Sequence, residues 1–156
     1  MIALLALLLA AWQAPAGRSA IGIYQGWGAF REAAPAHCFA IAQPIDRTLR
    51  RDAFVSIASW PGRGLRNQLH VRLSRARSQG ARVVLTAGER RFTLLAGPRD
   101  AWAPDARTDA VIVAAMRGGR ALSVESVGAN GAPFADSYAL EGAASAIDAA
   151  ALACLR

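Results

Sequence analysis

The chain closes with the sequence Phe134-Ala-Asp-Ser-Tyr-Ala-Leu-Glu-Gly142, which leads into an alanine-rich run over residues 143–156. Alanine and serine alternate with larger side chains through the first part, and this weak period of two is typical of a strand. Gly142 interrupts the pattern, and Ile147 and Cys154 then share one apolar stripe of a helix. We therefore expect a closing strand, a glycine break and a helix that packs against a sheet.

Similar alternation in seven other stretches predicts further strands joined by short turns. They cover residues 21–31, 38–42, 53–60, 67–75, 82–87, 91–95 and 121–127. In the clearest of them, Leu69, Val71 and Leu73 alternate with polar side chains, which predicts one buried and one solvated face. The short connections favour antiparallel pairing of these strands.

The period changes after Pro98 and predicts a helix. Asp105 or Thr108 can cap its start, and Gly118-Gly119 can end it. The pattern as a whole predicts a β-rich α+β fold, an antiparallel β-sandwich or partly open barrel of six to eight strands with two helices, the last packed on the sheet. A chain of 156 residues is long enough for a single such domain.

The N-terminus has the pattern of a secretory signal. Residues 2–12 are almost wholly apolar, and Ala14-Pro15-Ala16 supplies small residues for cleavage. The apolar run is shorter than the roughly 20 residues of a membrane-spanning helix. We expect a signal peptide over residues 1–16, a single domain over residues 17–156, no transmembrane anchor and a periplasmic or secreted location. A buried strand or an uncleaved anchor is the alternative, and a start upstream would explain the lack of a basic residue before the run.

The chain has two cysteines, Cys38 and Cys154. In an oxidising compartment an even number of cysteines usually means a disulfide, so export predicts a bridge between them. Two free, buried thiols are the alternative.

The positive charge is concentrated in one segment. All eighteen basic residues are arginine, and residues 47–91 hold eleven of them against Asp52 and Glu89. We expect a surface there that binds anionic envelope lipid, anionic polysaccharide or an acidic protein partner. The candidate residues are Arg66, Arg72, Arg75, Arg77 and Arg82. Export argues against a nucleic-acid partner, and an arginine-rich surface that reflects G+C-rich coding is the alternative.

Several segments together span nearly the whole chain after residue 16. They are Trp27-Gly-Ala-Phe30, Cys38-Phe-Ala-Ile-Ala-Gln-Pro44, Phe92 with the strand around Leu94, Ala114-Ala-Met-Arg-Gly-Gly119, and Asp136-Ser-Tyr-Ala-Leu-Glu-Gly-Ala143 with Ala146 and Cys154. This set resembles the invasion-associated locus B family of Gram-negative bacterial envelope proteins. The resemblance implies an exported, non-catalytic protein, of a kind linked in some pathogens to entry into host cells.

The sequence carries no catalytic signature. His37 and Cys38 are neighbours on a predicted strand and point to opposite faces, so they do not form a working pair. Asp105 and Asp109 are explained by the start of a helix rather than by paired-carboxylate chemistry. No spacing matches a zinc site, and we expect no enzyme, no metal and no cofactor. His70 is expected to be a solvated side chain.

Two other functions stay open. One is a small-ligand-binding β-barrel of the periplasm, in which Trp27, Phe54 and Trp60 line an interior cavity. The other is an unrecognised envelope enzyme. Trp60 and Trp102 are either ligand platforms or, as their positions beside turns favour, edges of the core. The identity of the partner and the oligomeric state do not follow from the sequence.

Overall fold

The computed structural model describes residues 17–48 and 52–155. The predicted signal peptide over residues 1–16 lies outside these ranges, as do Arg50 and Arg51 of the basic segment. Within the described ranges, no helix has the length and apolar character that crossing a membrane requires.

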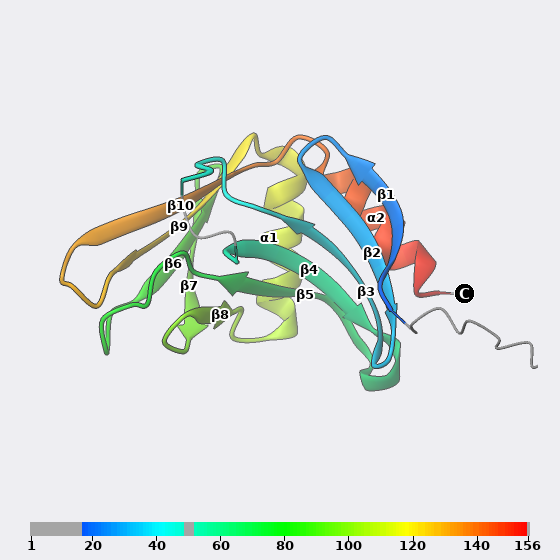
Figure 1. Cartoon of the computed structure of the whole chain (residues 1–156), viewed down its shortest axis with the longest axis horizontal. Coiled ribbons are helices and arrows are strands. Elements are labelled where there is room, and N and C mark those ends of the chain that lie inside the picture. The colour runs from blue at the N-terminus through cyan, green and yellow to red at the C-terminus, as the bar shows by residue number, and fades with distance from the viewer. Residues whose placement is uncertain (1–16, 49–51, 156) are drawn as a thin grey trace, which may run out of the picture.

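Ten strands in these ranges form one antiparallel sheet, which is strongly bent (Figure 1). They are β1 (Ser19–Tyr24), β2 (Trp27–Ala33), β3 (Ala36–Ala42), β4 (Phe54–Trp60), β5 (Leu65–Arg72), β6 (Val83–Ala87), β7 (Arg90–Ala96), β8 (Asp100–Trp102), β9 (Ala121–Val127) and β10 (Pro133–Ala139). Their order across the sheet is β1-β2-β3-β4-β5-β8-β7-β6-β9-β10. A short 3₁₀ turn, η1 (Pro61–Arg63), joins β4 to β5. The predicted β-rich α+β class is confirmed.

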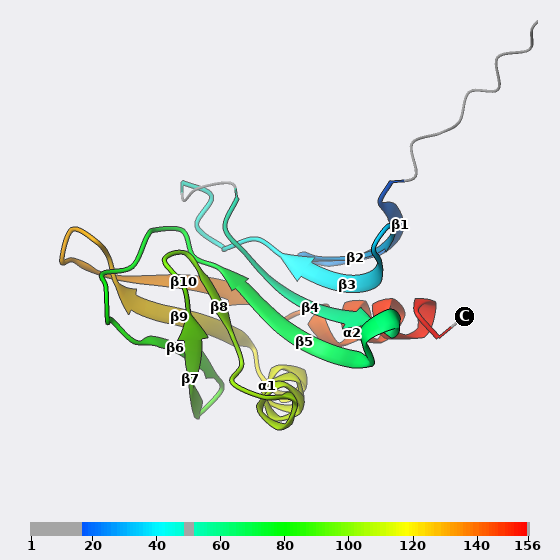
Figure 2. The ribbon, with the colours of Figure 1, turned by 90° about the horizontal axis from the view of Figure 1, so that it is seen from below.

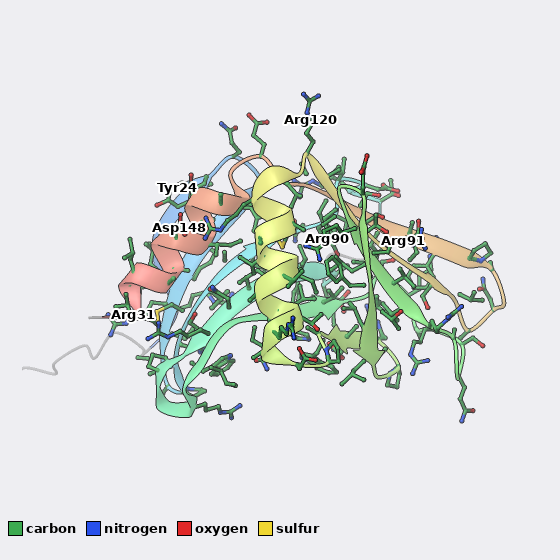
Figure 3. All side chains as sticks on the ribbon, turned by 180° about the vertical axis from the view of Figure 1, so that it is seen from behind. Tyr24, Arg31, Arg90, Arg91, Arg120 and Asp148 are labelled. Atoms are coloured by element: carbon green, nitrogen blue, oxygen red, sulfur yellow. A yellow bond between two sulfur atoms is a disulfide. The ribbon has the colours of Figure 1, made fainter. Side chains whose placement is uncertain are left out.

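Two helices, α1 (Ala106–Gly118) and α2 (Ala143–Ala153), lie on the same face of this sheet (Figure 3). The first packs on β5 and β6, and the second packs on β1 to β4. Figure 2 shows both helices on one side of β2 and β3. We call the face that the helices cover the inner face and the opposite face the outer face.

The predicted helix boundaries have clear physical causes. The Asp105 carboxylate accepts a hydrogen bond of 2.7 Å from the backbone N–H of Thr108, which caps α1. Gly119 follows the end of this helix. Arg117 in its last turn forms an ion pair with Asp148 of α2, which joins the two helices.

The sheet has two strands more than the eight stretches that the pattern predicts. The stretch over residues 21–31 is a hairpin of β1 and β2 rather than one strand, and Gln25 turns the chain with a φ of 55°. Strand β8 has only three residues, too few to show an alternation. It pairs with β5, with His70 opposite Trp102.

The closing stretch forms the predicted strand, glycine break and helix. Gly142 has a φ of 86°, and a Cβ atom placed on it would lie 2.0 Å from the carbonyl oxygen of Tyr24. Glycine is therefore required both by the backbone conformation and by the close contact. Trp27 is fully buried beside this turn, and its Nε1–H donates a hydrogen bond of 2.8 Å to the carbonyl oxygen of Ala139. These contacts hold the end of the chain against the β1–β2 hairpin.

The predicted disulfide between Cys38 and Cys154 is confirmed. It joins β3 to the residue that ends α2, with the two Cα atoms 5.8 Å apart. The sequence separation is 116 residues, and closing so long a loop lowers the entropy of the unfolded chain by the equivalent of about 4 to 5 kcal/mol in the chain-entropy description.

The core lies on the inner face and contains two buried carboxylates. Asp136 of β10 accepts hydrogen bonds from the backbone N–H and the hydroxyl of Ser74, just after β5. Asp109 of α1 accepts one of 2.8 Å from the backbone N–H of Leu69. Each carboxylate thus satisfies a buried backbone donor. Burial raises the pKa of Asp109, although the hydrogen bond from Leu69 opposes the effect.

The role of Asp109 predicts opposite effects for two substitutions. Asp109→Asn keeps an oxygen acceptor for Leu69 and removes a buried charge, so the free energy of unfolding at pH 7 should equal or exceed that of the wild type. Asp109→Ala leaves the backbone N–H of Leu69 unpaired and should lower the free energy of unfolding by about 1–3 kcal/mol.

The same pair of variants has a predicted pH dependence. The pKa of Asp109 is higher in the folded than in the unfolded protein. Protonated Asp109 therefore contributes fully to the free energy of unfolding below the unfolded pKa of about 4, and this contribution is lost as pH rises through the folded pKa. The advantage of Asp109→Asn over the wild type should therefore grow between pH 4 and pH 7. Urea unfolding at both pH values measures this, and a constant difference would contradict the assignment.

Candidate functional site

The outer face carries a groove whose floor is made by small side chains. Alternation along β4 sends Val55 and Ile57 to the core and Ser56 and Ala58 to the outer face. Both Ser56 and Ala58 are 7% exposed. Because larger side chains flank them on the neighbouring strands, these two positions form the bottom of a depression.

The walls of the groove come from strands on either side of β4. Ser56 pairs with Ile41 of β3 and with His70 of β5. Ala58 likewise pairs with Phe39 and Gln68, which lie on the same two strands. The resulting groove has a volume of about 490 Å³ and extends from Arg18 and Trp60 to Trp102. We refer to it as the outer-face groove.

Aromatic and imidazole rings are stacked in pairs along its walls. The His37 and Trp60 ring centroids lie 4.0 Å apart with the planes at 6°. The His70 and Trp102 rings lie 5.2 Å apart at 5°. Phe54 meets His70 edge to face. Stacking fixes the orientation of both histidines, so the groove has walls of defined shape.

A polar network fixes one end of the outer-face groove. Nε2 of His70 is 2.9 Å from Oδ1 of Asp100, and Nη1 of Arg72 donates a hydrogen bond of 2.7 Å to Oδ2 of the same carboxylate. Burial acts to raise the pKa of Asp100, but the hydrogen bonds from His70 and Arg72 outweigh it and lower the pKa below its ordinary value. His70 is therefore a stacked and hydrogen-bonded wall residue, and the expected solvated histidine is wrong.

The other end of the groove carries a second set of charges. Nε of Arg18 donates a hydrogen bond of 2.7 Å to Glu32. Glu32 also approaches Nε2 of His37 at 3.7 Å. The guanidinium of Arg63 lies over the Trp60 ring, 5.1 Å from its centroid. The arrangement offers ring faces and fixed hydrogen-bonding groups, which are the means of binding a ligand.

The same residues do not make an evident metal centre. In residues 17–48 and 52–155 there is no group of three or more His, Cys, Asp or Glu that could hold a metal ion.

The five arginines predicted to bind an anionic surface have different surroundings. Arg72 is paired with Asp100 on the outer face. Arg66 lines a second cavity of about 300 Å³ next to Cys154. Arg75 and Arg82 are exposed. The structure does not bring Arg66 and Arg72 together, and binding of an anionic surface by these arginines stays a prediction.

The fifth of them, Arg77, is held by the backbone. Its guanidinium donates hydrogen bonds to four carbonyl oxygens, those of Gly97 (2.7 Å), Ala96 (2.7 Å), Ala81 (2.8 Å) and Ser78 (3.3 Å). Arg77 therefore joins the loop before β6 to the end of β7, and its charge serves the fold.

The aromatic residues expected to line an interior cavity are divided between two places. Trp27 belongs to the core, whereas Phe54 and Trp60 line the outer-face groove. Trp102 also lines this groove and is 38% exposed, so it has the place of a platform rather than of a core edge. The sequence feature that could have predicted this groove is the run Phe54 to Trp60, where two small residues lie between aromatic ones on one face of a strand.

A bent antiparallel sheet with both helices on one face places the chain among β-rich α+β proteins. Its fold is similar to that of invasion associated protein B from Bartonella henselae, with a TM-score of 0.65 and 16% sequence identity, over 86% of this chain and 98% of that chain. No protein-family model matches the chain, and no curated protein matches it. The likeness is one of fold, and it supports the family resemblance at the level of the fold alone.

The surroundings of Arg77 predict a stability effect. Arg77→Gln removes charged hydrogen bonds to four carbonyl oxygens and should lower the free energy of unfolding by about 2–3 kcal/mol. Arg75→Gln, a matched change at an exposed position, should alter it by less than about 0.5 kcal/mol. Chemical unfolding of both variants measures the difference. Equal effects would show that the hydrogen bonds of Arg77 do not stabilise the fold.

Proposed function

We propose that this chain is an exported, non-enzymatic envelope protein of the invasion-associated locus B type, which binds a ligand through its outer-face groove. The groove carries the proposal, because it places ring faces and fixed polar side chains around a floor that no described helix covers. Such a site binds without needing a reactive group.

Two further observations support the location. The disulfide between Cys38 and Cys154 is of the kind that persists in oxidising compartments such as the periplasm or the cell exterior. The fold is similar to that of a protein named for invasion. In pathogenic relatives, binding through this face would contribute to entry into host cells.

The proposal favours a groove over an interior ligand cavity. Trp27 is fully buried in the core and is hydrogen-bonded to Ala139, so it does not line a space for a ligand. The alternative of a small-ligand-binding barrel with Trp27, Phe54 and Trp60 around an interior cavity is therefore set aside.

Export is tested by expressing the full chain in a Gram-negative host. We expect the protein in the periplasm or the medium, an N-terminus at Gly17 or a nearby residue, and no thiol that reacts before reduction. N-terminal sequencing, cell fractionation and thiol labelling measure the three properties. Protein that starts at Met1 and stays in the cytosol would overturn the assignment.

Binding through the groove is tested with isolated cell envelopes as the probe. The exported protein should sediment with them, and Ala58→Trp, which fills the floor of the groove, should remove most of this binding. Ala110→Trp is the matched control, because Ala110 is exposed on α1, on the opposite side of the sheet. Thermal unfolding first checks that both variants are folded. If both then sediment equally with the envelopes, binding does not occur through the groove.

A further inference from the structure

The ring faces of the outer-face groove are partly occupied by other side chains. His37 and the guanidinium of Arg63 both lie against the Trp60 ring. His70 is stacked on Trp102, a residue that is nevertheless 38% exposed. An aromatic ligand held between two rings would have to separate a stacked pair before it could insert. A sugar ring needs only one ring face, on which its C–H groups lie against the electron-rich side of the aromatic system.

The polar groups of the groove suit the hydroxyls of a sugar. Glu32 in the wall of the groove is paired with Arg18, and His70 in the wall is held by Asp100, which also pairs with Arg72 behind it. The groove therefore places an acceptor beside donors, which suits sugar hydroxyls because they both donate and accept. Gln68 adds an amide to the same groove.

The charge of the groove favours an acidic ligand. The lining of the groove carries two arginines, Arg18 and Arg63, against one acid, Glu32, and Arg18 is paired with Glu32. In the part of the chain that the structure describes, Arg63 has a ring contact but no acidic partner. One positive charge is therefore available to a carboxylate, sulfate or phosphate on the ligand.

The length of the groove favours several sugar rings over one. Trp60 lies four residues along β4 from Ser56, and Trp102 lies two strands away from Ser56 through His70. With a rise of about 3.3 Å per residue and about 4.8 Å between strands, the two tryptophans are roughly 16 Å apart. This distance exceeds the width of a single sugar ring.

An extended peptide fits the groove less well. Strands β3, β4 and β5 each have a paired strand on both sides, so their backbone offers no free edge for an added strand.

A lipid acyl chain also fits the groove less well. The floor contains the polar Ser56, and the walls contain both histidines and Gln68, which do not suit an acyl chain.

From these observations we propose that the outer-face groove binds an acidic oligosaccharide. Trp102 is the platform for one sugar ring, and Arg63 pairs with the acidic group of the ligand. The proposal rests on the proposed function, in which this face is the binding surface, and it adds the chemical class of the ligand.

The test uses the exported protein and three probes. They are an oligogalacturonate, a heparin-derived oligosaccharide and a neutral malto-oligosaccharide of similar length. Calorimetric titration should give binding of one or both acidic probes that weakens as salt is raised, and at least about ten-fold weaker binding of the neutral probe. Equal affinity for the neutral probe would overturn the acidic part of the proposal.

Variants locate the binding. Trp102→Ala should weaken binding of the acidic probe by about ten-fold or more, since it removes the platform. Arg63→Gln should weaken it and reduce its dependence on salt. The matched control, Arg75→Gln with Arg82→Gln, removes two exposed charges outside the groove and should change the affinity by less than about two-fold. If the control weakens binding as much as Arg63→Gln does, general attraction to arginine explains the result and the proposal falls.

Two results would separate this proposal from the proposed function. Envelopes that bind through the groove while all three oligosaccharides fail would retain the function and reject the ligand class. If the protein binds phosphatidylglycerol vesicles through Trp102 and Arg63 and binds no oligosaccharide, the ligand of the groove is a lipid surface instead. Loss of binding to both envelopes and oligosaccharides would reject the two proposals together.

Discussion

The close contact between Gly142 and the carbonyl oxygen of Tyr24 is the constraint on which the rest of the structure depends. Only a residue without a Cβ allows the closing strand to turn there and start α2 against the first hairpin. The disulfide from Cys38 to Cys154 then holds the other end of this helix on β3. With both ends attached, α2 stays on the inner face, and neither of the two described helices covers the outer face of the same strands.

The two faces of β4 show how one alternating sequence serves two purposes. Val55 and Ile57 reach the core that the helices cover, while Ser56 and Ala58 form the floor of the outer-face groove. A larger residue at Ala58 would leave the core unchanged and fill the groove. The side chains of β4 that pack in the core are therefore different from those that would contact the proposed ligand.

Charged side chains inside the fold mainly satisfy backbone groups. Asp109 and Asp136 accept hydrogen bonds from backbone N–H groups, and Arg77 donates to carbonyl oxygens. Arg72 is neutralised by Asp100. The number of arginines in the sequence thus overstates the positive charge that is free for a partner, because a buried or paired guanidinium is satisfied within the protein itself.

The sequence by itself determined the features that depend on neighbours along the chain: the capped helix after Asp105, the alternation around Leu69, and the glycine break at Gly142. With two cysteines it also allowed only one pairing, while the tertiary structure decided that the two thiols meet and form the bridge. Only the tertiary structure decided which side chains come together in the outer-face groove. Trp102 reaches His70 because β8 pairs with β5, and the order of strands follows from how the whole sheet buries its inner face rather than from any local pattern.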